Sequence, residues 1–444
     1  MSEVVATAQQ GLTGKYHPYP EYKDSGVEWL GEVPSHWGVL PCRAGVTHLV
    51  AKNTDGKEDN YLSLMANIGI VLYEDKGDVG NKKPDDLTKC KIVRKGNLVI
   101  NSMNYAIGSY GMSPYDGICS PVYIILDANT DVVEQRYALR LFENKPFQKH
   151  LAILGNGILE HRAAIGWDDI KGQYIPFPSL PEQHTIAAFL DYETARIDRL
   201  IAQQQRLIEL LKEKRQAVIS HAVRTRASEG HIKLAYAINL LTGYPFASSG
   251  FKSTKDTHIP LLRGANVGVD QIKWDDVVYW DSEDCSHLDD YYLERGDIVF
   301  GMDRPWISSG ARVAEITQHD TPCLLLQRVA RIRAKANHFQ SYIKLCLSSN
   351  EFRNYVEADL TGVSVPHISP DQIKGFLIRN LPYDEQVSVT NEVLQVLEKL
   401  NAVERAAFNA IELLQERRTA LISAAVTGKI DLRGWTPPSD EEAA

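Results

Sequence analysis

The sequence lacks the closely spaced cysteines and the long apolar runs that mark metal ribbons, redox motifs and membrane proteins. Its six cysteines are scattered over 444 residues, and the closest two, Cys323 and Cys346, lie 23 positions apart. This spacing excludes CxxC zinc or thioredoxin chemistry and predicts reduced thiols. No apolar run approaches the roughly 18 residues of a membrane helix, and the N-terminus lacks a signal-peptide pattern. We therefore expect a cytoplasmic protein without a membrane segment.

Catalytic signatures are also missing. The sequence contains no glycine-rich dinucleotide fingerprint, P-loop, HExxH or GxSxG, and no NPPY or DPPY string typical of amino-methyltransferases. One nuclease-like set, Asp131 with Glu143-Asn144-Lys145, lies in a segment of helical periodicity, so a solvated helix face is the expected interpretation. The histidines never fall at metal-ligand spacing. We expect no catalytic residue, no metal and no cofactor in this chain.

The charge distribution leaves nucleic-acid binding open. The formal net charge is −9, but the acidity is concentrated in residues 384–444, which hold 6 basic and 11 acidic residues. Residues 15–178 hold 18 basic against 20 acidic residues, and residues 230–383 hold 16 against 18. Each of these parts is therefore nearly neutral and has enough basic residues for a basic face. The local candidates are Lys82, Lys83, Arg94-Lys95 and the Arg331, Arg333, Lys335 series.

An internal repeat is the most informative feature that is present. IELLKEKRQAVISHAV (208–223) returns as IELLQERRTALISAAV (411–426), an offset of 203 positions. The same offset relates two IKG strings and the pairs Glu182-Gln183 and Glu385-Gln386. ANIGI (66–70) and RKGNLV (94–99) return more loosely as ANVGV and ERGDIV. The chain is therefore predicted to contain two copies of one unit.

Each common segment is predicted to form a long helix. Ser179 and Glu182 fit a capping box at the start of the first helix. Apolar residues then recur every 3.5 positions, which is typical of a coiled-coil seam. The chain direction favours antiparallel pairing, and two unrelated amphipathic helices, each packed on its own domain, are the alternative. The seam residues are Ile186, Leu190, Ile197, Leu200, Leu207, Leu211 and Val218, followed by Val389, Val393, Val396, Leu400, Val403, Ala407, Ala410, Leu414 and Leu421.

The two globular parts have mixed signals. Short β-rich runs at 97–100, 122–126, 297–300 and 324–334 are separated by turn residues. One amphipathic helix is expected in each part, near 131–151 and near 338–357. The predicted class is α+β, with two pseudo-repeated mixed domains joined by two long helices in an antiparallel coiled coil. The predicted segments are a disordered N-terminus (1–14), domain one (15–178), a central spacer helix (179–229), domain two (230–383), a C-terminal spacer helix (384–430) and a tail (431–444).

Three strings resemble the specificity subunit of type I restriction–modification systems. They are YKDSGVEWLGEVPSHW (22–37), IPFPSLPEQHTIAAFLD (175–191) and the repeated IELL segment. The resemblance implies two target-recognition domains, each for one half of a bipartite asymmetric DNA site, and spacer helices that hold partner subunits. The implied partners are double-stranded DNA, two DNA adenine methyltransferase subunits and two restriction/motor subunits. Cofactors would belong to those partners, S-adenosylmethionine to the methyltransferase and ATP with Mg to the motor. In one departure from the family pattern, residues 224–246 lack a second GVEWLGxxPxHW string.

Two other classes remain open at this point. A non-catalytic coiled-coil scaffold that does not bind DNA is one, and a stand-alone DNA-modifying enzyme is the other. Sequence-specific DNA footprinting with the partner present separates the first alternative from a recognition subunit. Methylation or cleavage by the purified chain would identify the second.

The repeat also sorts the candidate site residues. Positions identical in both copies are expected to hold structure or to bind the partner that is used twice, and helix capping is the alternative for the Glu-Gln pairs. The partner-interface candidates are Glu182, Gln183, Arg215, Glu385, Gln386 and Arg418. Loops that differ between the copies are expected to read base edges, with an unremarkable surface role as the alternative for any one residue. The DNA-binding candidates are Lys82, Lys83, Asn101, Asn104, Tyr105, Tyr110, His161 and Arg162 in domain one, and Asp303, Arg304, Trp306, Ser308, Ser364 and His367 in domain two.

The spacer helices are predicted to set the number of unread base pairs between the two half-sites. Inserting four residues within 192–207, with a matching insert in the partner helix, adds about 6 Å of helix. That length lies between one and two base-pair rises of about 3.4 Å. Methylome sequencing should show a spacer longer by one or two base pairs and unchanged half-sites. Changed half-sites with an unchanged spacer would contradict the ruler hypothesis.

Overall fold

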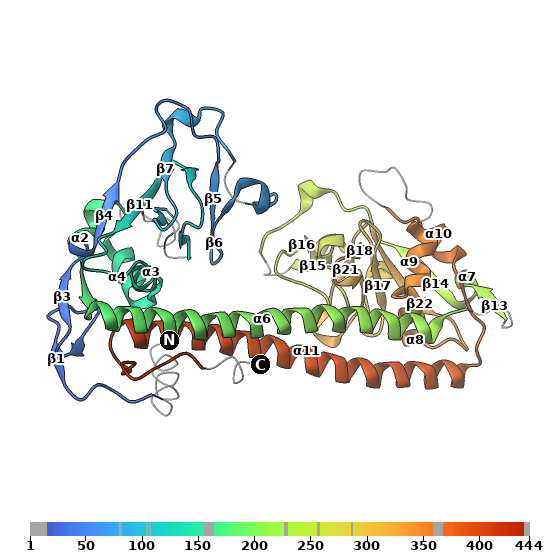
Figure 1. The fold of residues 1–444 in the computed structure, drawn as a ribbon. Coiled ribbons are helices and arrows are strands. Elements are labelled where there is room, and N and C mark those ends of the chain that lie inside the picture. The colour runs from blue at the N-terminus through green and yellow to red at the C-terminus, as the bar shows by residue number, and fades with distance from the viewer. Residues whose placement is uncertain are drawn as a thin grey trace. The chain divides into compact units, whose positions relative to one another are not determined.

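The chain folds into two compact units that share two long helices. The computed structural model describes residues 16–79, 82–103, 105, 108–154, 164–225, 230–254, 258–285, 287–357 and 367–438. Unit 1 comprises Met1–Gln203 with Asn409–Ala444, and unit 2 comprises Gln204–Phe408. Helices α6 (Leu180–Val223) and α11 (Tyr383–Val426) each give one half to each unit (Figure 1). The predicted mixture of helices and strands and the two long helices are confirmed.

Unit 1 is built around a four-stranded antiparallel sheet with the order β4-β11-β8-β9. Alternate side chains of its central strands face opposite sides, because successive residues of a strand alternate. Leu98 and Ile100 of β8 join the core that contains the long helices, whereas Val99 joins a second core under the β5–β6 hairpin. Both faces of the sheet are therefore covered. The elements are β1 (Tyr22–Asp24), β2 (Glu32–Pro34), β3 (Gly38–Pro41), α2 (Cys42–Gly45), β4 (Val46–Leu49), β5 (Leu62–Met65), β6 (Gly69–Leu72), β7 (Lys91–Val93), β8 (Leu98–Asn101), β9 (Tyr110–Met112), β10 (Gly117–Cys119), β11 (Tyr123–Ala128), α3 (Gln135–Glu143), α4 (Lys145–Leu154), α5 (Trp167–Ile170) and β12 (Tyr174–Phe177).

Unit 2 repeats this architecture. Its sheet has the order β14-β22-β17-β20, which matches the unit 1 sheet strand for strand. Ile298 and Phe300 of β17 face the helix-containing core, and Val299 faces a separate cluster, as their counterparts in β8 do. The elements are β13 (His231–Lys233), α7 (Leu234–Ala237), β14 (Ile238–Thr242), β15 (His258–Leu262), β16 (Val278–Asp281), β17 (Ile298–Gly301), β18 (Trp306–Ile307), β19 (Gly310–Ala311), β20 (Val313–Glu315), β21 (Leu324–Leu325), β22 (Val329–Ala334), α8 (Gln340–Leu347), α9 (Asn350–Glu357), α10 (Pro370–Gly375) and β23 (Leu377–Arg379).

The two long helices run antiparallel within each unit. In unit 1 the first half of α6 shares a core with the last turns of α11, since one cluster contains Ile186 and Leu190 together with Leu421. In unit 2 the last turns of α6 share a core with the first half of α11, since one cluster contains Ile219 together with Val393. The beginning of each helix thus packs near the end of the other. This arrangement favours mutual packing over two unrelated amphipathic helices.

The predicted seam is only partly correct. Leu200, Val396 and Val403 are 38%, 38% and 44% exposed, whereas Phe189 and Leu397, which the 3.5-residue pattern omitted, are buried. The reason is that each helix also covers a globular part, so its buried face is wider than a two-helix seam.

Three other local predictions need correction. Each expected amphipathic helix is a pair of short helices, α3 with α4 and α8 with α9. The expected strand 324–334 is divided into β21 and β22, because Arg328 between them has a positive φ of 72°. The central helix ends at Val223, before the predicted boundary at 229.

The core of unit 2 provides a test of this packing. Phe300 is fully buried against Phe352, with ring centroids 5.8 Å apart, whereas Phe408 on α11 is 49% exposed. Phe300→Ala should lower the free energy of unfolding by about 3–5 kcal/mol, because it removes buried surface and leaves a cavity. Phe408→Ala, the matched control, should change it by less than about 1 kcal/mol. Urea unfolding followed by circular dichroism measures both, and equal losses would contradict the assigned core.

Candidate nucleic-acid interface

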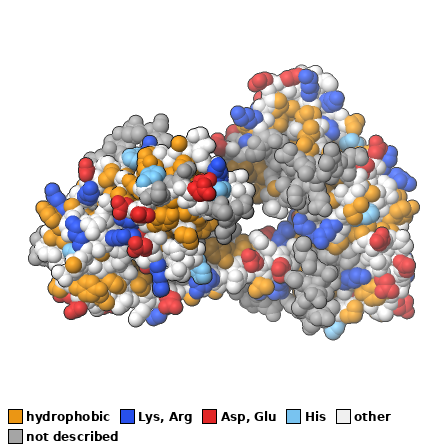
Figure 2. Space-filling model, turned by 180° about the vertical axis from the view of Figure 1, so that it is seen from behind, with side chains coloured by type: hydrophobic (Ala, Val, Ile, Leu, Met, Phe, Trp, Pro, Cys, Tyr) orange, Lys and Arg blue, Asp and Glu red, His pale blue; other side chains and the backbone are white. Residues whose placement is uncertain are grey.

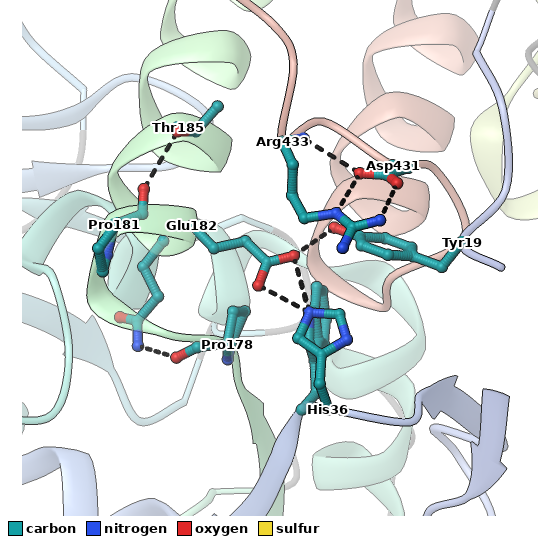
Figure 3. Close-up of polar contacts among 10 residues, drawn as sticks. Tyr19, His36, Pro178, Pro181, Glu182, Thr185, Asp431 and Arg433 are labelled. Carbon is teal, nitrogen blue, oxygen red and sulfur yellow. Dashed lines mark hydrogen bonds and ion pairs between the residues drawn. The ribbon is translucent and has the colours of Figure 1, made fainter. Parts of the chain in front are cut away.

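A buried carboxylate at the start of α6 binds side chains of the N-terminal segment of unit 1. Glu182 Oε1 accepts a hydrogen bond from Tyr19 Oη at 2.7 Å, and His36 Nε2 lies 3.0 Å from Oε2 (Figure 3). Trp37 Nε1 also donates to Oε1, at 3.1 Å. Burial and the bond to Glu182 raise the pKa of Tyr19 well above its ordinary value, so the tyrosine stays a donor. Arg433 lies over the Tyr19 ring at 5.1 Å. We call these contacts the Glu182 hub.

The hub corrects the predicted capping box, because the Glu182 side chain reaches other segments of the chain instead of the amide of Ser179. Its repeat counterpart, Glu385, is exposed. Two of the Glu182 partners, His36 and Trp37, belong to the PSHW end of the motif that residues 224–246 lack. The missing string therefore accounts for the exposed glutamate in unit 2.

The neighbouring glutamines have the same structural role in both units. Gln183 Oε1 accepts from Glu134 N at 2.9 Å, and its Nε2 donates to Val132 O and Pro178 O. Gln386 Oε1 accepts from Phe339 N at 2.9 Å, and its Nε2 donates to the carbonyl oxygens of residues 337 and 381. Both side chains are buried. Each glutamine satisfies backbone groups where the globular part meets its long helix.

The repeated arginines also act within the chain. Arg418 Nε lies 3.3 Å from Asp198, and Arg215 Nη1 donates to Asn401, which is the counterpart of Asp198 at the same offset of 203. Arg215 Nη2 lies 2.6 Å from Asp270. Burial alone raises the pKa of Asp270, but the charges of Lys344 and Arg215 hold it below the ordinary value.

These contacts revise the predicted partner interface. The side chains of Glu182, Gln183 and Gln386 are buried and bonded inside the chain, so the structural role that stood as their alternative is favoured. Arg215 and Arg418 are 23% and 31% exposed and pair with their own units. Glu385 remains an exposed candidate.

Three DNA-binding candidates of unit 1 have packing roles. Asn101 is 5% exposed, and its Oδ1 accepts from Met103 N. Tyr105 is buried and donates to Phe142 O at 2.8 Å. Tyr110 packs edge-on against Tyr105, and burial raises its pKa to about 12. Their burial and contacts therefore favour a structural role for these three side chains.

The described candidates of unit 2 lie at and after the end of β17, together with His367. His367 Nδ1 lies 2.6 Å from Asp303 Oδ1, and the backbones of these two residues form a β-bridge. Arg304, with a positive φ of 44°, and Ser308 are exposed. Trp306 packs on Phe352 at 5.7 Å and is half-buried.

Two arginines of this cluster were not among the predicted DNA-binding residues. Arg328 Nη1 lies 3.1 Å from Asp303 Oδ1, and Arg312 Nη1 donates to Asp303 O at 2.8 Å. Burial lowers the pKa of Arg312, the charge of Asp303 opposes this effect, and the charge of Arg304 adds to it. The one sequence feature that could have indicated the two arginines is their position directly before β22 and β20. Their position next to Asp303 results from the pairing of strands in the folded sheet.

The remaining candidates are not gathered into a site. Lys82 and Lys83 are exposed on a connection of unit 1. Arg333 pairs with Asp297 at 2.5 Å, and Arg331 donates to Asp290 O, so the basic strand is largely engaged within unit 2. Asn104, His161, Arg162 and Ser364 lie outside the described residues.

The described part of the chain contains no group of three or more His, Cys, Asp or Glu residues placed to hold a metal ion. Glu143 of the nuclease-like string pairs with Arg140. No helix among the described residues has the length and apolar character to cross a membrane. On the face seen in Figure 2, basic and acidic side chains are interspersed.

Two copies of one sheet-and-helix unit with different exposed loops define a protein built from an internal structural repeat. No protein-family model matches the chain. The EcoAI specificity subunit of Escherichia coli is 36% identical over 179 residues, which are 39% of this chain and 30% of that protein. The match thus spans less than a third of that relative. The MjaVIII specificity subunit of Methanocaldococcus jannaschii is 24% identical, over 71% of this chain and 75% of its own length.

Solved structures agree on the fold. A chain from a study of complex assembly in a type I restriction–modification system has a TM-score of 0.69 at 14% identity, over 89% of this chain and 98% of its own. The HsdS subunit of Thermoanaerobacter tengcongensis has a TM-score of 0.51 at 15% identity, over 90% and 98%. The chain is similar to the specificity subunits of type I restriction–modification systems, as its motifs predicted.

The repeat supplies a matched pair of variants for the Glu182 hub. Glu182→Gln should lower the free energy of unfolding by about 1–3 kcal/mol, because it weakens charge-assisted bonds to buried donors. Glu385→Gln, at the exposed equivalent position, should leave it within about 0.5 kcal/mol. Urea denaturation of both variants decides this, and an equal effect would contradict the asymmetry between the units.

Proposed function

We propose that the chain is the DNA sequence-specificity subunit of a type I restriction–modification enzyme. Each unit reads one half of a bipartite asymmetric site. The chain also holds two DNA adenine methyltransferase subunits and, through them, two restriction/motor subunits. It carries no cofactor itself, since S-adenosylmethionine belongs to the methyltransferase and ATP with Mg to the motor. We place the assembly in the cytoplasm.

The observation that carries the proposal is the contrast between what the two units share and where they differ. They share the strand order of the sheet, the glutamine bonds at the helix starts and the arginine contacts along the helices. They differ in the exposed side chains at the ends of β8 and β17. A common scaffold with unlike loops is suited to reading two unlike half-sites. The similarity to specificity subunits supports the same function.

The interspersed charges fit a subunit that works with partners. Phosphate contacts dominate the affinity of DNA-binding proteins and require many basic side chains. This chain has 48 basic against 57 acidic residues. Partner subunits would then supply much of the phosphate contact, and this chain would supply base readout.

A methylome tests the proposal. Cells that express the full chain together with its methyltransferase should acquire adenine methylation at one bipartite motif, because recognition then has a catalyst. Cells that express either component alone are the control and should acquire none. Methylation or cleavage by the purified chain alone would favour a stand-alone enzyme, and the absence of any new motif in the co-expressing cells would contradict the proposal.

A further inference from the structure

Three separate segments meet at the same place in both units. In unit 2, Met302 N donates to Arg328 O at 3.0 Å and Ile368 N donates to Met302 O at 2.9 Å. In unit 1, Ser102 Oγ donates to Val122 O at 3.0 Å and Ile165 N donates to Ser102 O at 3.0 Å. In each unit these bonds join three segments: the end of one central strand (β8 or β17), the start of the neighbouring strand (β11 or β22) and the segment that precedes α5 or α10. The two units can therefore be compared position by position here.

The side chains at the equivalent positions have opposite chemistry. Asp303, Arg328 and His367 of unit 2 correspond to Met103, Val122 and Ala164 of unit 1 by strand register and by these bonds. Met103 and Val122 are 49% and 46% exposed. The Arg328 side chain is 59% exposed. One backbone framework thus presents an apolar pair in unit 1 and a charged group in unit 2.

This difference favours base reading over phosphate binding. Phosphates are the same in every DNA sequence, so a phosphate contact needs a cationic or polar side chain in both units. Base edges differ, and a site for a thymine methyl is apolar whereas a site for guanine is a hydrogen-bond donor. The change from Val122 in unit 1 to Arg328 in unit 2 is therefore typical of residues that contact base edges.

The surroundings of Arg328 hold its guanidinium in place. Asp303 Oδ1 lies 3.1 Å from Arg328 Nη1 and 2.6 Å from His367 Nδ1, so the carboxylate is fixed from two sides. Within the described residues, the bond to Asp303 is the one hydrogen bond of the Arg328 side chain. An arginine side chain has five N–H donors, so this guanidinium has donors left for a ligand. Arg304 and Arg312 next to Asp303 leave the cluster with an excess of positive charge.

The backbone conformation of the cluster also supports a functional role. Arg304 and Arg328 have positive φ values of 44° and 72°, which are uncommon for residues other than glycine. Such strained positions concentrate at functional sites. An exposed ion pair adds little to stability, so the pair with Asp303 does not by itself explain why an arginine holds this conformation.

We propose that Arg328 is a specificity-determining residue of unit 2 that donates two hydrogen bonds to a guanine edge in the major groove, with Asp303 as the positioning residue. The inference rests on the proposed function and deepens it by naming the base and the residue. Arg328 is matched to guanine because its planar fork fits the O6 and N7 acceptors of that base. The apolar pair of Met103 and Val122 suits a half-site with a different base at the corresponding place.

The test compares methylomes of cells that express the full chain variant with its methyltransferase. In Arg328→Ala, one guanine position of one half-site should become degenerate, with a loss of discrimination of roughly 5- to 150-fold, and every other position should stay the same. Arg328→Lys keeps the charge but not the fork, so it should relax the same position. Asp303→Asn should relax that position partly, with an unchanged melting temperature of the complex. Arg353→Ala, which removes an exposed arginine paired with Glu357, is the control and should leave the motif unchanged.

The outcomes separate the two hypotheses. A wild-type motif that persists unaltered in Arg328→Ala overturns this inference and leaves the proposed function intact. Uniformly weaker binding of the purified complex to all sequences, with the motif kept, also overturns it, since that is the behaviour of a phosphate contact. If Arg328→Ala does not assemble, Arg328→Lys decides, and an unaltered motif in that variant refutes the inference. The absence of any wild-type motif refutes the proposed function and this inference together.

Discussion

The need to bury one face of each long helix at both of its ends governs the rest of the structure. α6 and α11 are each 44 residues long, and each places half of its apolar face in the core of unit 1 and half in the core of unit 2. A helix of this length is not stable through its backbone alone and depends on tertiary packing. The globular part of each unit provides that packing. The helices in turn cover one face of its sheet.

The junction between helix and globular part is the point at which polar groups must be satisfied. Gln183 and Gln386 form the same hydrogen bonds at this junction: each accepts from one backbone amide and donates to two backbone carbonyls. Leaving such groups buried without partners would cost about 1–3 kcal/mol each. The occurrence of the glutamine in both copies of the Glu-Gln pair therefore has a structural explanation. The glutamate has one in unit 1 only, where the N-terminal segment supplies Tyr19, His36 and Trp37.

The proposed recognition surface lies apart from this scaffold. The central strands of both sheets are buried on both faces, so they tolerate little change. Their ends open onto exposed loops, where Met103 and Val122 in one unit stand in place of Asp303 and Arg328 in the other. A fixed framework with variable strand ends allows the surface to change without a change in the core.

Periodicity and identity along the chain were enough to predict the repeat, the two long helices, several central strands and the resemblance to specificity subunits. The sequence also located the loop that begins at Asp303. The accessibility of the predicted residues followed from the folded structure alone: Asn101 and Tyr105, predicted for the loop of unit 1, are buried, whereas in unit 2 Arg328, from a distant segment, lies beside Asp303. The folded structure likewise turned the predicted cap at Glu182 into a buried acceptor for three side chains. Burial and the choice of hydrogen-bond partner depend on contacts between residues far apart in the chain, and local sequence patterns do not encode these contacts.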